Sequence, residues 1–71
     1  MNMTLNDAFN KATNGDRRLI IYRDYEKRRV AAQGEWFKDH MINYREKHRA
    51  DLVELIGESM TTVTVALKEE K

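Results

Sequence analysis

The chain contains no cysteine, and at 71 residues this absence limits most strongly what it can fold into. A domain of this size buries only about 60% of the surface that its unfolded chain exposes, so its hydrophobic core is small. Without cysteine, neither disulfide bonds nor thiolate metal sites can add stability. The remaining sources are well-packed secondary structure and association with another chain. We therefore expect one domain, residues 1–71, that forms a homo-oligomer.

The composition is that of a globular protein, with 41% apolar and 35% charged residues. The first residues, Met-Asn-Met-Thr, interleave polar and apolar side chains and do not resemble a signal peptide. No apolar run approaches the roughly 18 residues that a membrane span requires. We expect a cytoplasmic protein that has no membrane partner, and the missing cysteines suit a reducing compartment.

A short helix is predicted to begin at Thr4 and to end at Asn14–Gly15. Thr4 is a good N-cap, and Asp7 stands three residues later, where a capping box needs an acceptor. The spacing i, i+3, i+4, i+7 places one apolar face on Leu5, Ala8, Phe9 and Ala12. Asn and Gly accept the left-handed conformation that commonly ends a helix.

The next segment, Arg17 to Arg23, is ambiguous. Leu19 to Tyr22 consists of β-branched, aliphatic and aromatic residues, which favours a short strand. The segment contains no Gly or Pro, so a helix remains the alternative. We predict the strand, with Asp24 as the N-cap of the element that follows.

A long amphipathic helix is predicted from Tyr25 to about Gly57, because strong helix formers occur throughout and proline does not. Its clearest part is 35–56. There the apolar stripe advances by three or four residues and consists of Phe37, Met41, Tyr44, His48, Leu52 and Leu55. The stripe lapses at Gly34, which costs about 1 kcal/mol inside a helix. We therefore expect a kink or break near Gln33–Gly34.

The last segment changes period. Val63, Val65 and Leu67 alternate with smaller or polar residues, which predicts a C-terminal strand with one apolar face. The predicted fold class is therefore α+β but mainly α. Its elements are a short N-terminal helix, a short strand, a long kinked or broken helix and a C-terminal strand.

Catalytic and metal-binding patterns are weak. His40, Tyr44 and His48 form a ladder on the predicted helix, but the two histidines would lie about 12 Å apart along its axis, too far to share one ion. We interpret these rings as flanking the core. The three glycines are widely spaced, which excludes a glycine-rich phosphate loop. We expect no catalytic residue, no metal site and no cofactor.

The strongest candidate for a binding site is a basic segment with two interleaved tyrosines. It comprises Arg17, Arg18, Tyr22, Arg23, Tyr25, Lys27, Arg28 and Arg29. Arginines bind phosphates and aromatic rings stack on unpaired bases, so the mixture suits nucleic acid. However, the net charge is only +1, and the acidic residues from Asp51 onward would repel a polyanion. Contact with an acidic protein surface and a merely solvated basic face are the other interpretations.

A second contact surface is predicted at Ile42 and Val53. They stand eleven residues apart, about three helical turns, on the polar side of the predicted long helix. This surface would serve the oligomer or a partner. The other interpretation is that the two residues touch the short N-terminal helix or the C-terminal strand.

Taken together, these features predict a non-enzymatic interaction protein that acts as a homo-oligomer. We expect an adaptor or inhibitor of a larger protein with an acidic surface, as found among small bacterial and viral accessory proteins. A nucleic-acid-binding regulator that uses residues 17–29 is the first alternative. A small-ligand-binding protein with its pocket at an oligomer interface is the second.

Overall fold

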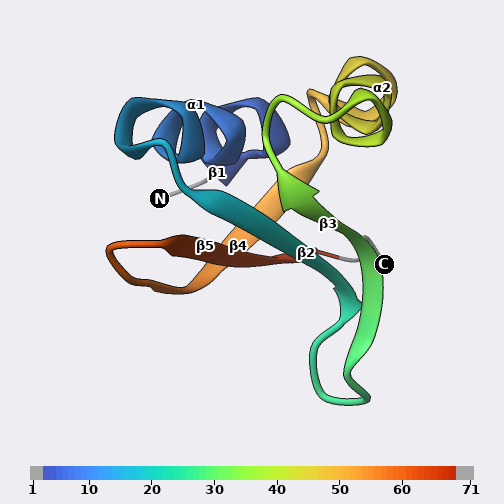
Figure 1. Cartoon of the computed structure of the whole chain (residues 1–71). Helices are drawn as coiled ribbons and strands as arrows, with labels where there is room; N and C mark the ends of the chain where they lie inside the picture. The colour runs from blue at the N-terminus through green and yellow to red at the C-terminus, as the bar shows by residue number, and fades with distance from the viewer. Residues whose placement is uncertain (1–2, 69–71) are drawn as a thin grey trace.

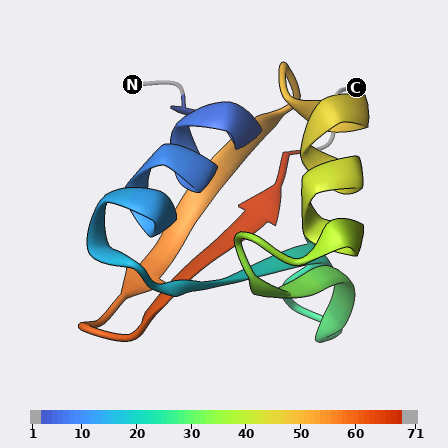
Figure 2. The same cartoon turned by 45° about the horizontal axis from the view of Figure 1, so that its top comes forward.

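The computed structural model describes residues 3–68 and places two helices on one side of a five-stranded sheet (Figure 1). The elements are β1 (Met3–Thr4), α1 (Leu5–Gly15), β2 (Arg18–Asp24), β3 (Arg29–Glu35), α2 (Asp39–His48), β4 (Leu52–Glu58) and β5 (Thr62–Leu67). The strand order is β1-β4-β5-β2-β3. The central strands β5 and β2 are parallel, and the other pairs are antiparallel. Figure 2 shows α1 and α2 side by side over the same face of the sheet.

The core lies between the two helices and the central strands. Leu19 and Ile21 of β2 stand beside Val63 and Val65 of β5 in parallel register, and all four side chains are fully buried. The whole core cluster consists of Leu5, Ala8, Phe9, Ala12, Leu19, Ile21, Met41, Val53, Val63 and Val65. Complete burial of a Val, Leu, Ile, Phe or Met side chain contributes about 1.5–3 kcal/mol, so this face supplies most of the folding energy.

The predicted N-terminal helix is confirmed. Thr4 is its N-cap, and the capping box with Asp7 is complete, with both reciprocal hydrogen bonds at 3.2 Å. The predicted apolar face of α1 is buried as expected. The helix ends at Gly15, but Asp16 is the residue that adopts the left-handed conformation, with φ 52°.

Both predicted strands are also confirmed. Arg17 to Arg23 forms most of β2, so the helical alternative for this segment is wrong. β2 is a central strand with neighbours on both sides, which explains why its β-branched and aromatic residues favour it. β5 buries Val63 and Val65 and leaves Leu67 partly buried, in agreement with the predicted alternation.

The mainly α prediction is wrong, because about 44% of the described chain is strand and 32% is helix. The segment predicted as one long helix instead forms β3, the ten-residue helix α2 and β4. Local helix propensity is a weak preference, and here it is outweighed by pairing of β3 with β2 and of β4 with β5.

The predicted apolar stripe is therefore dispersed over several elements. Of its members, only Met41 belongs to the buried core, whereas Phe37 is 48% and Leu55 38% exposed. The expected helix break at Gln33–Gly34 is instead a point in strand β3 where Gly34 has φ 143°. A Cβ atom at Gly34 would lie 3.1 Å from Nε2 of His40, so this position requires glycine for its backbone and for space.

A single arginine joins the two helices. The guanidinium group of Arg45 in α2 donates to the side-chain oxygens of Asn6 and Asn10 in α1, at 2.9 and 3.1 Å. Its Cζ atom lies 5.4 Å from the centre of the Phe9 ring. Polar contacts therefore fix α2 beside α1, since Met41 is its only fully buried residue. Within residues 3–68, neither helix is long and apolar enough to cross a membrane.

Candidate functional site

The face of the sheet opposite the helices has no helix over it in the part of the chain that the structure describes (Figures 1 and 2). The strand registers place on this open face Arg18, Ile20 and Tyr22 of β2, Thr62, Thr64 and Ala66 of β5, and Glu54 and Ile56 of β4. Ile20, Tyr22 and Ile56 are half-buried. The centre of the open face is therefore apolar and still accessible.

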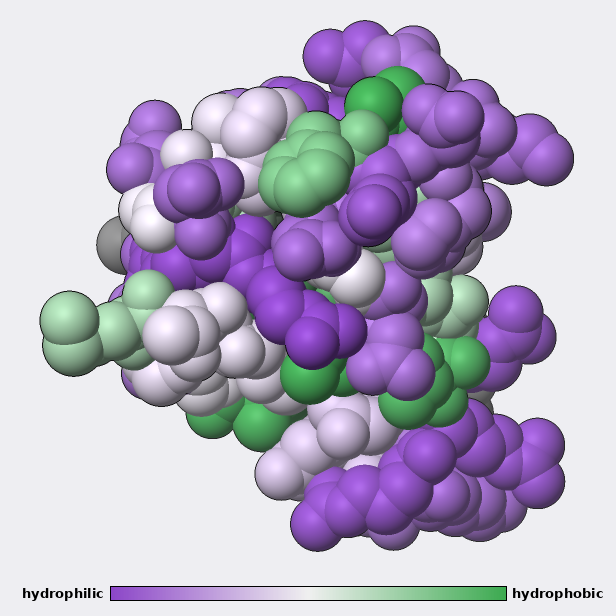
Figure 3. All heavy atoms as spheres, in the orientation of Figure 1, coloured by the Kyte–Doolittle hydropathy of each residue, from purple (hydrophilic) through white to green (hydrophobic). Residues whose placement is uncertain are grey.

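The hairpin of β2 and β3 bends away from the helices and forms a wall beside the open face. The β2–β3 register shifts twice, between Ile21 and Tyr22 and between Tyr22 and Asp24. Such bulges bend a strand and increase its twist. Figure 1 shows the hairpin tip, residues 25–29, at the lower right, and Figure 3 shows that this region is almost entirely hydrophilic.

The turn at the hairpin tip is held by specific hydrogen bonds. Oδ1 of Asp24 accepts from the backbone N–H of Lys27 at 3.3 Å, so Asp24 caps this turn rather than the predicted helix. The N–H of Arg28 donates to the carbonyl oxygen of Tyr25 at 3.1 Å. Arg28 itself adopts a left-handed conformation, with φ 57°, which costs a residue with a side chain about 1–2 kcal/mol.

The left-handed conformation of Arg28 accompanies a stacked series of side chains. Its Cζ atom lies 4.2 Å from the centre of the Tyr25 ring, and its Nη1 atom donates to the Tyr25 carbonyl oxygen at 2.9 Å. The Tyr25 ring meets the ring of Tyr22 edge to face, with 5.1 Å between centroids. Cation–π and aromatic contacts of this kind each contribute about 0.5–1.5 kcal/mol. The three side chains are therefore ordered before any partner arrives.

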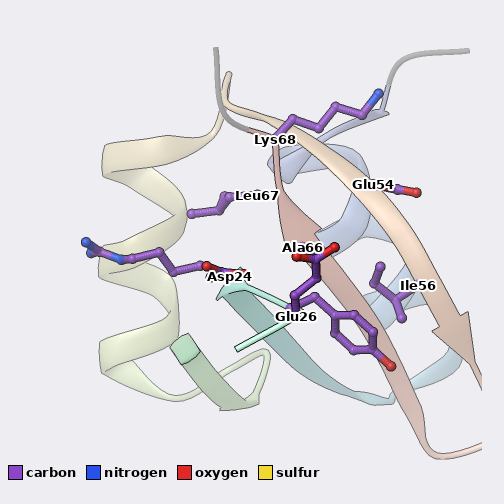
Figure 4. A pocket seen from close by; sticks show the side chains of 9 residues that line it. Asp24, Glu26, Glu54, Ile56, Ala66, Leu67 and Lys68 are labelled. Carbon is purple, nitrogen blue, oxygen red and sulfur yellow. The ribbon is translucent and has the colours of Figure 1, made fainter. Parts of the chain in front are cut away.

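An open hollow of about 660 Å³ lies between the hairpin and the open face (Figure 4). Its lining residues are Arg23, Asp24, Tyr25, Glu26, Glu54, Ile56, Ala66, Leu67 and Lys68. Figure 4 shows the carboxylate of Glu26 reaching toward Ala66, while Lys68 points outward at the far end. The hollow thus combines an apolar floor with three carboxylates and two cations, Arg23 and Lys68.

The charged groups of the tip and the hollow do not pair with one another. The ion pairs within the described residues join Lys11 and Arg17 to Glu58, and His48 to Asp51. None of these pairs includes the three cations of the tip, Lys27, Arg28 and Arg29. None includes the three carboxylates of the hollow, Asp24, Glu26 and Glu54. Both sets of charges therefore remain available to an external partner.

The predicted basic segment does not form one continuous surface. Arg17 is partly buried and donates to Glu58 and to the carbonyl oxygens of Ser59 and Lys11, so it links α1 to the β4–β5 turn. Arg18 is exposed on the open face. Arg23 lines this hollow and a second, smaller one, and lies close enough to Tyr44 of α2 to lower its pKa. Only Tyr22, Tyr25 and the three tip cations are gathered in one place.

Tyr44 lies in the second half of α2 and is partly buried. Burial raises the pKa of the Tyr44 phenol, the nearby Asp51 carboxylate adds to this, and Arg23 opposes it. Arg23 and Asp51 also line a hollow of about 260 Å³ together with Leu52, Leu67 and Lys68.

Ile42 lies in α2 and Val53 in β4, so the two residues do not share the helix on which their predicted contact surface rested. Ile42 is 42% exposed on α2, whereas Val53 is 1% exposed in β4 and belongs to the core.

The two histidines do not converge on one site. His40 bonds the carbonyl oxygen of Gln33 at 2.9 Å, and Nδ1 of His48 lies 3.0 Å from Asp51. No group of metal-ligating side chains occurs among residues 3–68.

Sequence reasoning missed Glu26, Glu54 and Ile56 as members of a site, because the predicted helix covered all three. One signal could have located Glu26. The charged run Asp24 to Arg29 separates two segments that can form strands, as a hairpin turn does.

Comparisons of the chain with known protein families, with curated proteins and with solved structures give no significant match. The geometry of the tip, the hollow and the open face is therefore the available guide to function.

Proposed function

We propose that the chain is a non-catalytic protein-binding module that contacts a larger partner protein through its hairpin tip and open face. The stacked series of Tyr22, Tyr25 and Arg28 is the observation that supports this most strongly. Tyrosine and arginine are enriched among the residues that dominate binding energy at protein interfaces. A series that is already ordered loses less conformational entropy when it binds.

The charges of the tip indicate the chemistry of the partner surface. Lys27, Arg28 and Arg29 are consecutive, exposed and outside every ion pair of the described chain. Ile20 and Tyr22 on the adjoining open face add accessible apolar area. The best complement is a protein surface with carboxylates around an apolar spot. Such charge complementarity accelerates association and selects the partner.

Nucleic acid fits the same site less well. Base stacking on Tyr25 would be favourable, but the carboxylates of Asp24, Glu26 and Glu54 line the hollow directly beside the tip. A polyanion would therefore meet like charges at the point of contact. The net charge of +1 also gives little long-range attraction.

A small-ligand site is also less favourable. Such sites bury 70–90% or more of the ligand surface. The hollow beside the hairpin is open and wide, so it suits a protruding element of another protein better than an enclosed small molecule.

The substitution Arg28→Gly tests this proposal while preserving the fold. Glycine adopts the left-handed conformation of residue 28 without strain, so the turn should persist while the guanidinium group is lost. Asp16→Gly is the matched control, because Asp16 is also left-handed but lies at the end of α1. With the tagged chain as bait in its native cell, the partner protein should be captured at least about tenfold less by Arg28→Gly, as expected for a hot-spot residue. Asp16→Gly should capture as much as the unmodified chain.

Equal capture by Arg28→Gly and the unmodified chain would exclude the tip from the contact. A gel shift with generic DNA or RNA at sub-micromolar concentration that weakens steeply with salt would assign the tip to nucleic acid instead.

A further inference from the structure

The basic hairpin tip lies next to a hollow that is lined by more carboxylates than cations. Three cations occupy the tip, and Asp24, Glu26 and Glu54 line the hollow together with Arg23 and Lys68 over an apolar floor of Ile56 and Ala66. Within the described chain they form no ion pair with each other. We propose that the tip of one chain seats in the hollow of a second copy, and the reverse, in a two-fold symmetric homodimer.

The arrangement of the chain allows both contacts to form at once. In a two-fold dimer, a contact between residue i of one copy and residue j of the other is repeated between residue j of the first copy and residue i of the second. Tyr25 and Glu26 line the hollow, and the three cations follow directly in sequence. A two-fold axis between the tip and the hollow, rather than at Glu26, would bring each basic tip to the carboxylates of the other copy.

The hollow also offers apolar contact to the seated tip. The side chain of Arg28 is long, and its methylene groups can cover apolar surface while its guanidinium group meets a carboxylate. Ile56 lies in the lining of the hollow (Figure 4), and Tyr25 also lines it. The dimer would thus bury apolar area that the small monomeric core leaves accessible.

This inference rests on the proposed function in one respect, since the same tip serves both contacts. The dimer would cover the residues that we assign to the partner protein. Self-association and partner binding therefore compete, and free monomer is the binding-competent form. The apparent affinity for the partner should fall as the chain concentration rises above the dimer dissociation constant.

Charge reversal in two complementary variants tests the dimer. Arg28→Glu with Arg29→Glu makes the tip acidic, and Glu26→Lys with Glu54→Lys makes the hollow basic. Sedimentation equilibrium at low salt should give twice 8.4 kDa for the unmodified chain and 8.4 kDa for each variant alone. An equimolar mixture of the two variants should recover the dimer, because each tip then meets a hollow of opposite charge. Raising the salt from 0.05 to 0.5 M should weaken the unmodified dimer about tenfold or more.

If the unmodified chain sediments as a monomer at every concentration up to about 100 μM, the dimer is overturned. Reversed variants that still dimerise alone would overturn the assignment to the tip and hollow. Circular dichroism melts check that each variant folds. If the first variant does not fold, Lys27→Glu with Arg29→Glu leaves Arg28 and its turn intact and makes the same prediction.

The two proposals fail in different ways. An unmodified monomer whose partner capture still requires Arg28 would refute the dimer and leave the proposed function standing. A dimer restored by mixing, together with partner capture that does not change in Arg28→Gly, would refute the proposed function and leave the dimer standing.

Discussion

The helix-covered face of the sheet and its open face differ in both composition and burial. Under the helices, Leu19, Ile21, Val63 and Val65 are fully buried and entirely apolar. On the open face, half-buried apolar and aromatic side chains alternate with charged and polar ones. The difference indicates that one face stabilises the fold and the other is left accessible. Substitutions on the two faces should therefore have separable effects.

The two phenylalanines provide the largest contrast. Phe9 is fully buried against α2 and the sheet, whereas Phe37 is 48% exposed before α2. Phe9→Ala should cost about 3–5 kcal/mol of the free energy of unfolding, which is close to the whole stability of a small domain. Phe37→Ala should cost less than about 1 kcal/mol. Urea unfolding followed by fluorescence of Trp36, the single tryptophan, measures both values. Similar losses in the two variants would contradict the assigned core.

Two adjacent isoleucines sharpen the comparison within one strand. Ile21 points to the helices and is fully buried, whereas Ile20 lies on the open face beside Thr64 and is half-buried. Ile21→Ala should lower the free energy of unfolding by about 2–5 kcal/mol, and Ile20→Ala by about 1 kcal/mol. The same urea titration applies to both. A larger loss of unfolding free energy in Ile20→Ala than in Ile21→Ala would show that the two faces of β2 have been assigned the wrong way round.

A smaller effect is expected from Tyr44 at alkaline pH. Burial raises the pKa of its phenol, so the folded state holds the protonated form more strongly than the unfolded state does. This contribution is fully present below the unfolded value of about 10 and is lost as the pH rises through the folded pKa. Stability should therefore decline above about pH 10. Tyr44→Phe should make that decline shallower and should leave the dependence of stability on pH near pH 7 unchanged. Thermal melts from pH 7 to above pH 10 would measure both effects. An identical alkaline decline in the variant would exclude Tyr44 as a cause.

Local signals in the sequence were sufficient to predict the secondary structure near the two ends of the chain. The capping box of Thr4 and Asp7, the helical spacing of Leu5 to Ala12 and the alternation of β5 all involve residues within one element. Each of these patterns is consistent with only one type of secondary structure. The predicted α1 and β5 are correct for this reason, whereas β2 was preferred over a helix only for its β-branched and aromatic residues.

The middle of the chain depends on pairing between distant segments, which one-dimensional periodicity does not contain. Leu52 and Leu55 are spaced as on a helix, yet β4 forms because it pairs with both β1 and β5. Arg29 to Glu35 contains several good helix formers, yet it pairs with β2. Both segments were predicted as helix, and this error also placed Ile42 and Val53 on one helix.

The candidate site was predicted only in part, for the same physical reason. Tyr22, Tyr25 and the tip cations were selected because their residue types suit binding, and the hairpin brings them together. Arg17 has the same residue type but forms three hydrogen bonds within the chain. The acidic hollow was missed because Glu26 and Glu54 are 28 positions apart and meet only through the fold.

The most direct test of the separation between the structural core and the proposed binding residues is the urea unfolding of Arg28→Gly. Relief of the left-handed conformation should offset the lost cation–π contact, so the free energy of unfolding should stay within about 0.5 kcal/mol of the unmodified chain. The same preparation should sediment with a weakened dimer and capture less partner protein. A loss of stability as large as that of Phe9→Ala would contradict the account, because Arg28 would then be part of the structural core.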